Sequence, residues 1–168
     1  FVLMNIESQK IDINNDKKTL GLTERWITSQ LSTTLNATQE GIKTYRFDLA
    51  SQALYEFVWN EYCDWYLEFS KSTLNDKETS EEEKRGTLYT LVHILETSLR
   101  GLHPFIPFIT EELWQRVASI LSKNSETIML ESYPSESEFE KDNKADEEIE
   151  WIKSFIMGVR KIRSERDI

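Results

Sequence analysis

Hydrophobic residues recur every three or four positions over most of the chain, which is the spacing of one face of an α-helix. The pattern predicts helices over about 23–45, 49–70, 80–103 and 107–122, and a last helix from about residue 146. On the second helix we expect the buried face to be Ala50, Leu54, Val58, Tyr62 and Trp65. On the last we expect a buried stripe of Trp151, Ile152, Phe155, Ile156, Val159 and Ile162.

Polar residues and proline mark the predicted helix ends. Asp48 is the expected N-cap of the second helix, and Ser80 with Glu83 forms a capping-box pattern at the start of the third. Pro104 ends the third helix, because the residue before a proline disfavours the α conformation.

The segments between the helices differ in character. Residues 1–20 open with a short apolar run, turn polar and are interpreted as a linker. Residues 71–79 form a loop, the acidic segment 135–148 is expected to be a mobile loop, and 127–130 ("TIML") is the one convincing extended run.

These elements predict an all-α fold, an antiparallel bundle of four to five helices that occupies residues 21–168. Composition agrees, because 30% of the residues are charged and the chain holds only five glycines and three prolines. The chain starts without Met and its last apolar pattern is unbroken, so we expect an excised piece of a longer protein, truncated in the last helix.

The densest aromatic run is "FVWNEYCDWYLE", residues 57–68. Buried rings serve a core, whereas exposed rings beside amides and charges stack on bases. We expect Trp59, Tyr62, Cys63 and Tyr66 mostly to pack the bundle, while polar neighbours set the register or face a ligand.

Charge is unevenly distributed. The net charge of −10 argues against general nucleic-acid affinity, since phosphate contacts need Lys and Arg. Residues 136–150 hold eight acids against two lysines, whereas 153–168 hold five basic residues against two acids. Arg160 and Arg163 share one side of the last helix, where they either meet a phosphate backbone or form an ordinary solvated face.

The chain carries no motif for catalysis, metal binding or membrane insertion. Its single cysteine excludes an intrachain disulfide, and no Cys/His cluster, His-Glu-x-x-His spacing or glycine-rich phosphate loop occurs. Glu61, Asp64 and Glu68 share a helix side without a histidine at ligand spacing, and we interpret them as a polar flank. We therefore predict no catalytic residue and no metal ligand, a cytoplasmic location and no membrane partner.

Four segments carry a resemblance to a known family. They are "YRFDLASQALYEFVWNEYCDWYLE" (45–68), "LRGLHPFIPFITEELWQR" (99–116), "TIML" (127–130) and "VRKIRSE" (159–165). In this order they resemble the helical anticodon-binding domain of class I aminoacyl-tRNA synthetases for aliphatic amino acids. The "HPFIPFITEELW" corner is similar in the isoleucine and leucine branches, whereas "EFVWNEYCDWYLE" resembles the valyl-tRNA synthetase family more narrowly.

The resemblance implies a bundle that grips the anticodon stem and loop of a valine-specific tRNA and helps to verify anticodon letters A and C. The parent enzyme would join valine to its tRNA with ATP. ATP, the H-I-G-H and K-M-S-K-S signatures, and the catalytic and editing domains would lie outside this fragment, which needs no cofactor; residues 1–20 would leave the catalytic core. Open alternatives are the isoleucyl or leucyl enzyme and an acidic helical protein-interaction module. DNA is not an expected partner.

Seven residues are the predicted RNA contacts. A cation and a ring at the turn into the second helix would reach a splayed base, an amide and a carboxylate would read base edges, and three further cations would hold phosphates. In that order they are Arg46 and Phe47, Asn60 and Glu61, and Arg100, Arg160 and Arg163. The alternatives are a core position for Phe47 and an internal ion pair of Arg100 with Glu96.

Overall fold

The computed structural model describes residues 1–9 and 11–166, and the regular elements of the described chain are all helices, without a strand. This confirms the predicted all-α class. The elements in order are α1 (Val2–Gln9), α2 (Leu22–Lys43), α3 (Phe47–Glu56), the π-helix η1 (Phe57–Tyr66), α4 (Leu67–Asn75), α5 (Glu81–Leu102), α6 (Pro107–Ala118), the 3₁₀ turns η2 (Ile128–Leu130) and η3 (Glu136–Glu138), and α7 (Asn143–Glu165).

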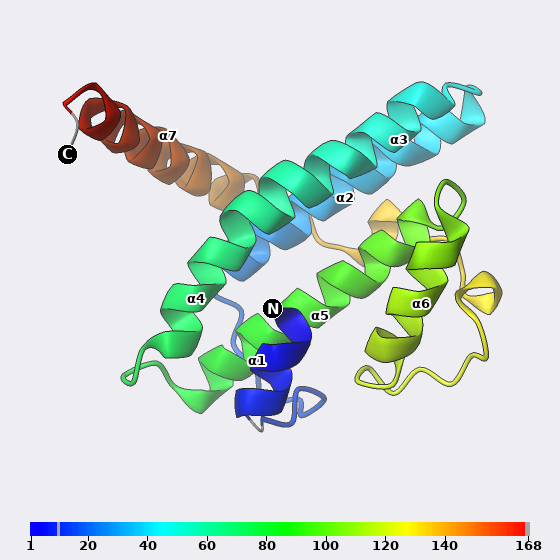
Figure 1. Ribbon diagram of the computed structural model, residues 1–168, viewed down its shortest axis with the longest axis horizontal. Helices are drawn as coiled ribbons and strands as arrows, with labels where there is room; N and C mark the ends of the chain where they lie inside the picture. The colour runs from blue at the N-terminus through cyan, green and yellow to red at the C-terminus, as the bar shows by residue number, and fades with distance from the viewer. Residues whose placement is uncertain (10, 167–168) are drawn as a thin grey trace.

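Three long rods form the bundle. Helices α3, η1 and α4 run on without a break as one rod, which lies antiparallel to both α2 and α5 (Figure 1). Helix α6 turns back along the end of α5, and α1 crosses α5 near its start (Figure 1). The core lies between the rods and holds two fully buried tryptophans, Trp26 and Trp114.

The observed N-cap of α5 is the residue predicted from the sequence, whereas that of α3 is not. The Ser80 hydroxyl accepts from the Glu83 backbone N–H, and the Glu83 carboxylate accepts from the Ser80 N–H at 3.0 Å, so the predicted capping box is confirmed. The N-cap of α3 is Arg46, and Asp48 lies inside the first turn. The Asp48 carboxylate binds the Arg46 guanidinium rather than a backbone cap position.

The middle of the long rod widens from α to π hydrogen bonding over η1. Its buried aromatic residues are Phe57, Tyr62 and Tyr66. Phe57 and Tyr62 are successive core positions five residues apart, whereas an α-helix would place them three or four residues apart. The predicted face assumed an uninterrupted α-helical period and chose Val58 and Trp65, which are only partly buried. This part of the prediction was wrong because the helix changes its period.

Both irregular segments after α6 differ from expectation. Residues 127–130 form a turn instead of an extended run, because the Thr127 hydroxyl accepts from the Met129 N–H and the Glu111 carboxylate accepts from the Ile128 N–H. The predicted mobile loop 135–148 is packed: Phe139 is buried, and α7 already begins at Asn143.

The first twenty residues are more than a linker. Helix α1 and residues 11–20, which we name the strap, lie against α5, with Val2 and Ile13 buried. The Arg85 guanidinium of α5 donates to the backbone carbonyls of Asp12 and Lys17, which holds the strap in place.

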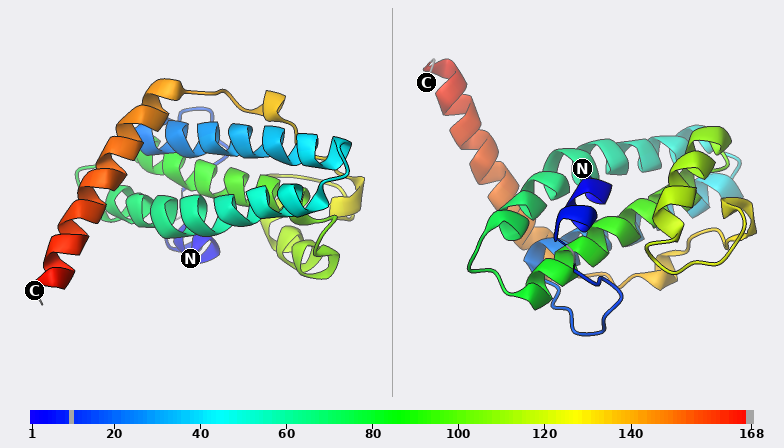
Figure 2. Two further views of the ribbon diagram at one scale, coloured as in Figure 1. Left: turned by 90° about the horizontal axis from the view of Figure 1, so that it is seen from above. Right: turned by 60° about the horizontal axis from the view of Figure 1, so that its bottom comes forward.

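Helix α7 leaves the bundle after its first turns (Figure 2). Ala145 and Ile149 are buried against the other helices, whereas the distal half projects away from the bundle. The predicted buried stripe was therefore wrong for most of its members: Ile152 and Ile156 are half-buried, and the exposed ones are Trp151, Phe155, Val159 and Ile162. Within the described residues, no helix combines the length and apolarity that a membrane crossing requires.

Candidate nucleic-acid interface

The turn between α2 and α3 presents two exposed rings. Tyr45 adopts a left-handed backbone conformation with φ of 59° and ends α2, a position that usually favours glycine. Its ring is 82% exposed and meets the exposed Phe47 ring edge to face, with centroids 6.4 Å apart. A bulky residue in this conformation beside an exposed ring marks a strained, candidate functional position. The alternative core position of Phe47 does not hold.

Arg46 stands between Tyr45 and Phe47 in the sequence, and its guanidinium forms a two-point hydrogen bond with the Asp48 carboxylate. Its Nε and Nη2 donate to the two carboxylate oxygens at 2.9 and 2.7 Å. This hydrogen bonding lowers the pKa of Asp48 to about 2 and raises that of Arg46. Both side chains are exposed, so the two-point hydrogen bond orients a guanidinium that stays accessible to a ligand.

An apolar hollow of about 440 Å³ adjoins the same turn. Its walls come from α2, α3, the α5–α6 corner and the segment after η2, and its lining residues are Ile42, Phe47, Pro104, Phe105 and Tyr133. The Tyr133 hydroxyl donates to the Gly101 carbonyl, and burial raises the pKa of Tyr133 to about 12. The hollow has the volume of a small-ligand site and suits a flat ring.

A second pair of exposed rings lies further along the rod. Tyr55 and Trp59 stack with centroids 6.3 Å apart and an interplanar angle of 5°, and they are 62% and 58% exposed. The expectation that Trp59 packs the bundle was wrong, since the widened helix turns Phe57 and Tyr62 inward and leaves Trp59 outside. Asn60 is exposed beside it. Tyr45 and Tyr55 were missed; the four-residue spacing of Tyr55 and Trp59 was the available signal.

We name the exposed side chains at the α2–α3 turn and along the first half of the rod the aromatic ridge. Its members are Tyr45, Arg46, Phe47, Tyr55, Trp59 and Asn60. From the turn at Phe47 to Asn60 the rod rises by about 20 Å, so the ridge spreads its contact points along this length.

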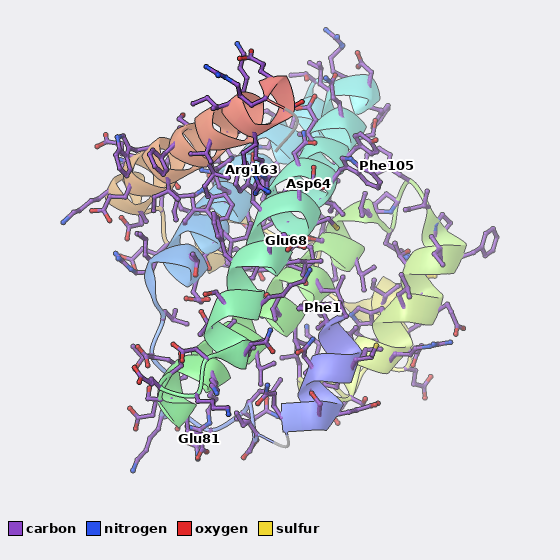
Figure 3. All side chains as sticks on the ribbon, turned by 60° about the vertical axis from the view of Figure 1, so that its left-hand side comes forward. Phe1, Asp64, Glu68, Glu81, Phe105 and Arg163 are labelled. Atoms are coloured by element: carbon purple, nitrogen blue, oxygen red, sulfur yellow. The ribbon has the colours of Figure 1, made fainter. Side chains whose placement is uncertain are left out.

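The other predicted contacts gather where α7 meets the rod. Lys153 of α7 donates to the Glu61 carboxylate at 2.8 Å, and the Arg160 guanidinium lies 5.3 Å from the Trp65 ring centroid. Arg163 extends from the exposed distal part of α7 (Figure 3). Glu61 is therefore already engaged by Lys153, whereas Arg160 and Arg163 of α7 are exposed.

A hollow of about 490 Å³ lies at this junction, with Asp64 and Glu68 along the rod (Figure 3). Arg160 and Cys63 also line it. Burial and the nearby Asp64 carboxylate raise the pKa of the Cys63 thiol, so this half-buried cysteine is a poor nucleophile.

Arg100 belongs neither to the aromatic ridge nor to the junction of α7 with the rod. Its side chain is 6% exposed, binds Glu96 at 3.0 Å and Glu138 at 3.1 Å, and donates to the Ser132 carbonyl. The guanidinium is used inside the fold and does not reach a phosphate. The structure thus agrees with the alternative, an internal ion pair of Arg100 with Glu96, and not with a phosphate contact, because the guanidinium is buried.

Residues 24–168 match the family described as the anticodon-binding domain of tRNA ligase. Two similar proteins are named valine–tRNA ligase, from Legionella pneumophila strains Lens and Paris. Each is 44% identical over 168 residues, which is 100% of this chain and 18% of the relative. The chain thus spans under a fifth of the length of these relatives. Its match along nearly the whole length, on an all-helical fold, shows that the chain belongs to the anticodon-binding domain family of tRNA ligases.

Proposed function

We propose that this domain recognises the anticodon of valine tRNA within a valine–tRNA ligase, which attaches valine to its tRNA with ATP. The family and the name of the 44% identical relatives support the valine enzyme over the isoleucine and leucine enzymes. The observation that carries recognition is the aromatic ridge, whose four rings, Tyr45, Phe47, Tyr55 and Trp59, are each more than half exposed and can stack on bases.

Unpaired bases would stack on the ridge. Single-stranded RNA is recognised by splayed bases that lie on aromatic rings and are read at their edges. Phe47 with its adjoining hollow and the Tyr55–Trp59 pair provide the ring surfaces. The Asn60 amide reads a base edge, and the oriented Arg46 guanidinium contacts a base or its phosphate.

The exposed cations of α7 would hold the phosphate backbone. Arg160, Lys161 and Arg163 make no ion pair with a described acid, so their charge is available to the ligand. Such contacts position the RNA without reading sequence. Glu61 instead fixes α7 through Lys153, and Arg100 stabilises the core.

The chemistry of valine transfer is proposed to lie in the rest of the parent chain, together with ATP and the editing function. We assign no catalytic residue, cofactor or metal ligand to this domain, and propose a cytoplasmic location for the parent enzyme. Its partners are then valine tRNA and the catalytic and editing domains of the same chain.

The test is a titration of the full-length protein with valine tRNA and with a copy whose anticodon letters are exchanged, at two salt concentrations. We expect tighter binding of the cognate tRNA and weaker binding of both at higher salt. Equal affinity for both tRNAs would refute anticodon recognition. Salt-independent binding would refute the role of the α7 cations.

A further inference from the structure

One irregular segment between η2 and η3 is tied to the bundle at each of its residues. Residues 131–134 belong to no helix or strand, and we name them the wall segment. Tyr133, its third residue, lines the apolar hollow of about 440 Å³ at the α2–α3 turn, which we name the ridge hollow. The wall segment therefore forms one side of the hollow in which a flat ring fits.

The first half of the wall segment is held by two cations. Lys123 donates to the Glu131 carboxylate at 2.5 Å, and Nη1 of Arg100 donates to the Ser132 carbonyl at 2.9 Å. Both cations also bind the fully buried Glu96 carboxylate, at 3.2 and 3.0 Å. Because salt screens buried pairs much less than exposed ones, this half is anchored firmly in the core.

The second half is held by neutral groups from two helices. The Tyr133 hydroxyl donates to the Gly101 carbonyl of α5 at 3.1 Å, and the Gln39 amide of α2 donates to the Pro134 carbonyl at 3.1 Å. Pro134 is buried, and its ring would lie 3.7 Å from a Cβ built at Gly101. The Tyr133 ring is thus fixed at its tip and through the residue that follows it.

These ties preorganise one side of a binding surface. An irregular segment without such ties would sample many conformations, and a ligand that needs one of them would have to order it on binding. Here the ordering accompanies folding. Phe47 contributes a second ring to the ridge hollow, and Phe105 adds a third from the α5–α6 corner (Figure 3).

We propose that Gln39 is a positioning residue for base recognition. By holding the Pro134 carbonyl, it keeps the Tyr133 ring where that ring and Phe47 enclose one unpaired base of the tRNA. The inference rests on the proposed function, in which the ridge hollow receives a flat ring. Among the described residues the Gln39 side chain makes no other hydrogen bond, whereas Arg100 also belongs to the core ion pair. Gln39 is therefore the tie that can be removed with the least effect on the fold.

Fluorine NMR of the full-length protein without RNA tests the position of the ring. Fluorotyrosine replaces Tyr133, and Gln39→Met removes the amide at nearly constant side-chain length. The matched control is Gln115→Met, because the Gln115 amide also donates to a backbone carbonyl of an irregular segment, that of Glu126 at 2.8 Å, away from the ridge hollow. Gln39→Met should shift or split the fluorine resonance, and Gln115→Met should leave it in place. An unmoved resonance in Gln39→Met would overturn the inference.

A double-mutant cycle with valine tRNA tests what the position is for. Gln39→Met should weaken tRNA binding several-fold in the wild-type background and have no further effect in a Tyr133→Ala background, because a positioning residue acts through the ring that it positions. Gln115→Met should bind as tightly as the wild type. Equal losses from Gln39→Met in both backgrounds would show a general structural role and overturn the inference.

Failure of this inference differs from failure of the proposed function. If the wild-type protein binds cognate and anticodon-exchanged tRNA equally, the proposed function is wrong and the positioning role falls with it. If the wild type discriminates and Gln39→Met binds valine tRNA as tightly as the wild type, only the positioning role of Gln39 is wrong.

Discussion

The Glu96 carboxylate and the Arg100 guanidinium form an internal ion pair one turn apart on α5, with an Nε–Oε1 distance of 3.0 Å. Glu96 is fully buried and also accepts from the Trp114 indole N–H at 2.9 Å. The pair joins α5 to α6 and, through Glu138, to the segment before α7. Arg100, for which the sequence predicts a phosphate contact, is thus part of the core.

Arg100→Ala should destabilise the fold by up to about 3–5 kcal/mol, since the buried Glu96 carboxylate would lose one of its two cations and keep only Lys123, 3.2 Å away. The matched control is Arg116→Ala, because Arg116 also pairs with an acid one turn away but is solvent-exposed. Its loss should cost about 0–1 kcal/mol. Urea unfolding compares the two, and similar losses would contradict the internal role of Arg100.

Gly86→Ala should destabilise the protein. A Cβ at this α5 position would lie 2.0 Å from the Thr19 backbone carbonyl oxygen, so the strap would have to move. At Gly158 a Cβ meets nothing within 4 Å, and Gly158→Ala should stabilise α7 by up to about 1 kcal/mol. Thermal unfolding of both variants should give shifts of opposite sign; a rise in Tm for Gly86→Ala would disprove the close approach.

Stability should fall as the pH drops below about 6.5, the ordinary pKa of histidine. Burial lowers the pKa of His93, where Glu96 and Glu138 oppose the shift and Arg100 and Lys123 add to it. The unfolded chain therefore binds the proton first, and folding loses free energy from the unfolded pKa down to the lower folded pKa. His93→Gln should flatten this slope in urea titrations; an unchanged slope would assign it to other groups.

Trp59→Leu should weaken binding of valine tRNA by about 1–3 kcal/mol, the usual cost of losing one base–aromatic stack. Trp59→Phe keeps a flat ring and should retain most of the affinity. Because Trp59 is exposed, neither variant should lower Tm appreciably. If leucine binds as well as phenylalanine in a tRNA titration, Trp59 provides no stacking surface.

Arg46→Ala should reduce tRNA affinity and lower the salt dependence of binding by about one contact, without unfolding the domain. Arg116→Ala serves again as control, because it removes an exposed, carboxylate-paired arginine from α6, far from the aromatic ridge in sequence. Binding isotherms at several salt concentrations separate the two variants. The role of Arg46 would be excluded if both gave the wild-type slope.

Local signals in the sequence predicted the fold well. The capping box at Ser80 depends on residues within one turn, and it is present. The buried face of the long rod was mispredicted because a periodicity argument assumes one helical repeat. No local sequence signal indicates that the helix changes from α to π at Phe57. The stripe of α7 is amphipathic in sequence, but periodicity alone does not say whether a partner covers it.

The candidate site was only partly visible for similar reasons. Arg46 and Phe47 could be named because a turn exposes its residues. Arg100 could not be separated from a ligand-binding cation, since an acid four residues away is equally common on surfaces and in cores. Trp59 was assigned to the core because an aromatic-rich helix usually buries its rings, and its exposure depends on the geometry of η1.

Phe57 and Tyr62 both face the core although they are five residues apart, so the helical period of the rod changes between them. A regular α-helix would need only four residues for this step, so the π segment holds one residue more than an α-helix would need to keep Phe57 and Tyr62 on the core face. The length of this stretch, and not only its composition, thus sets which way the rings point.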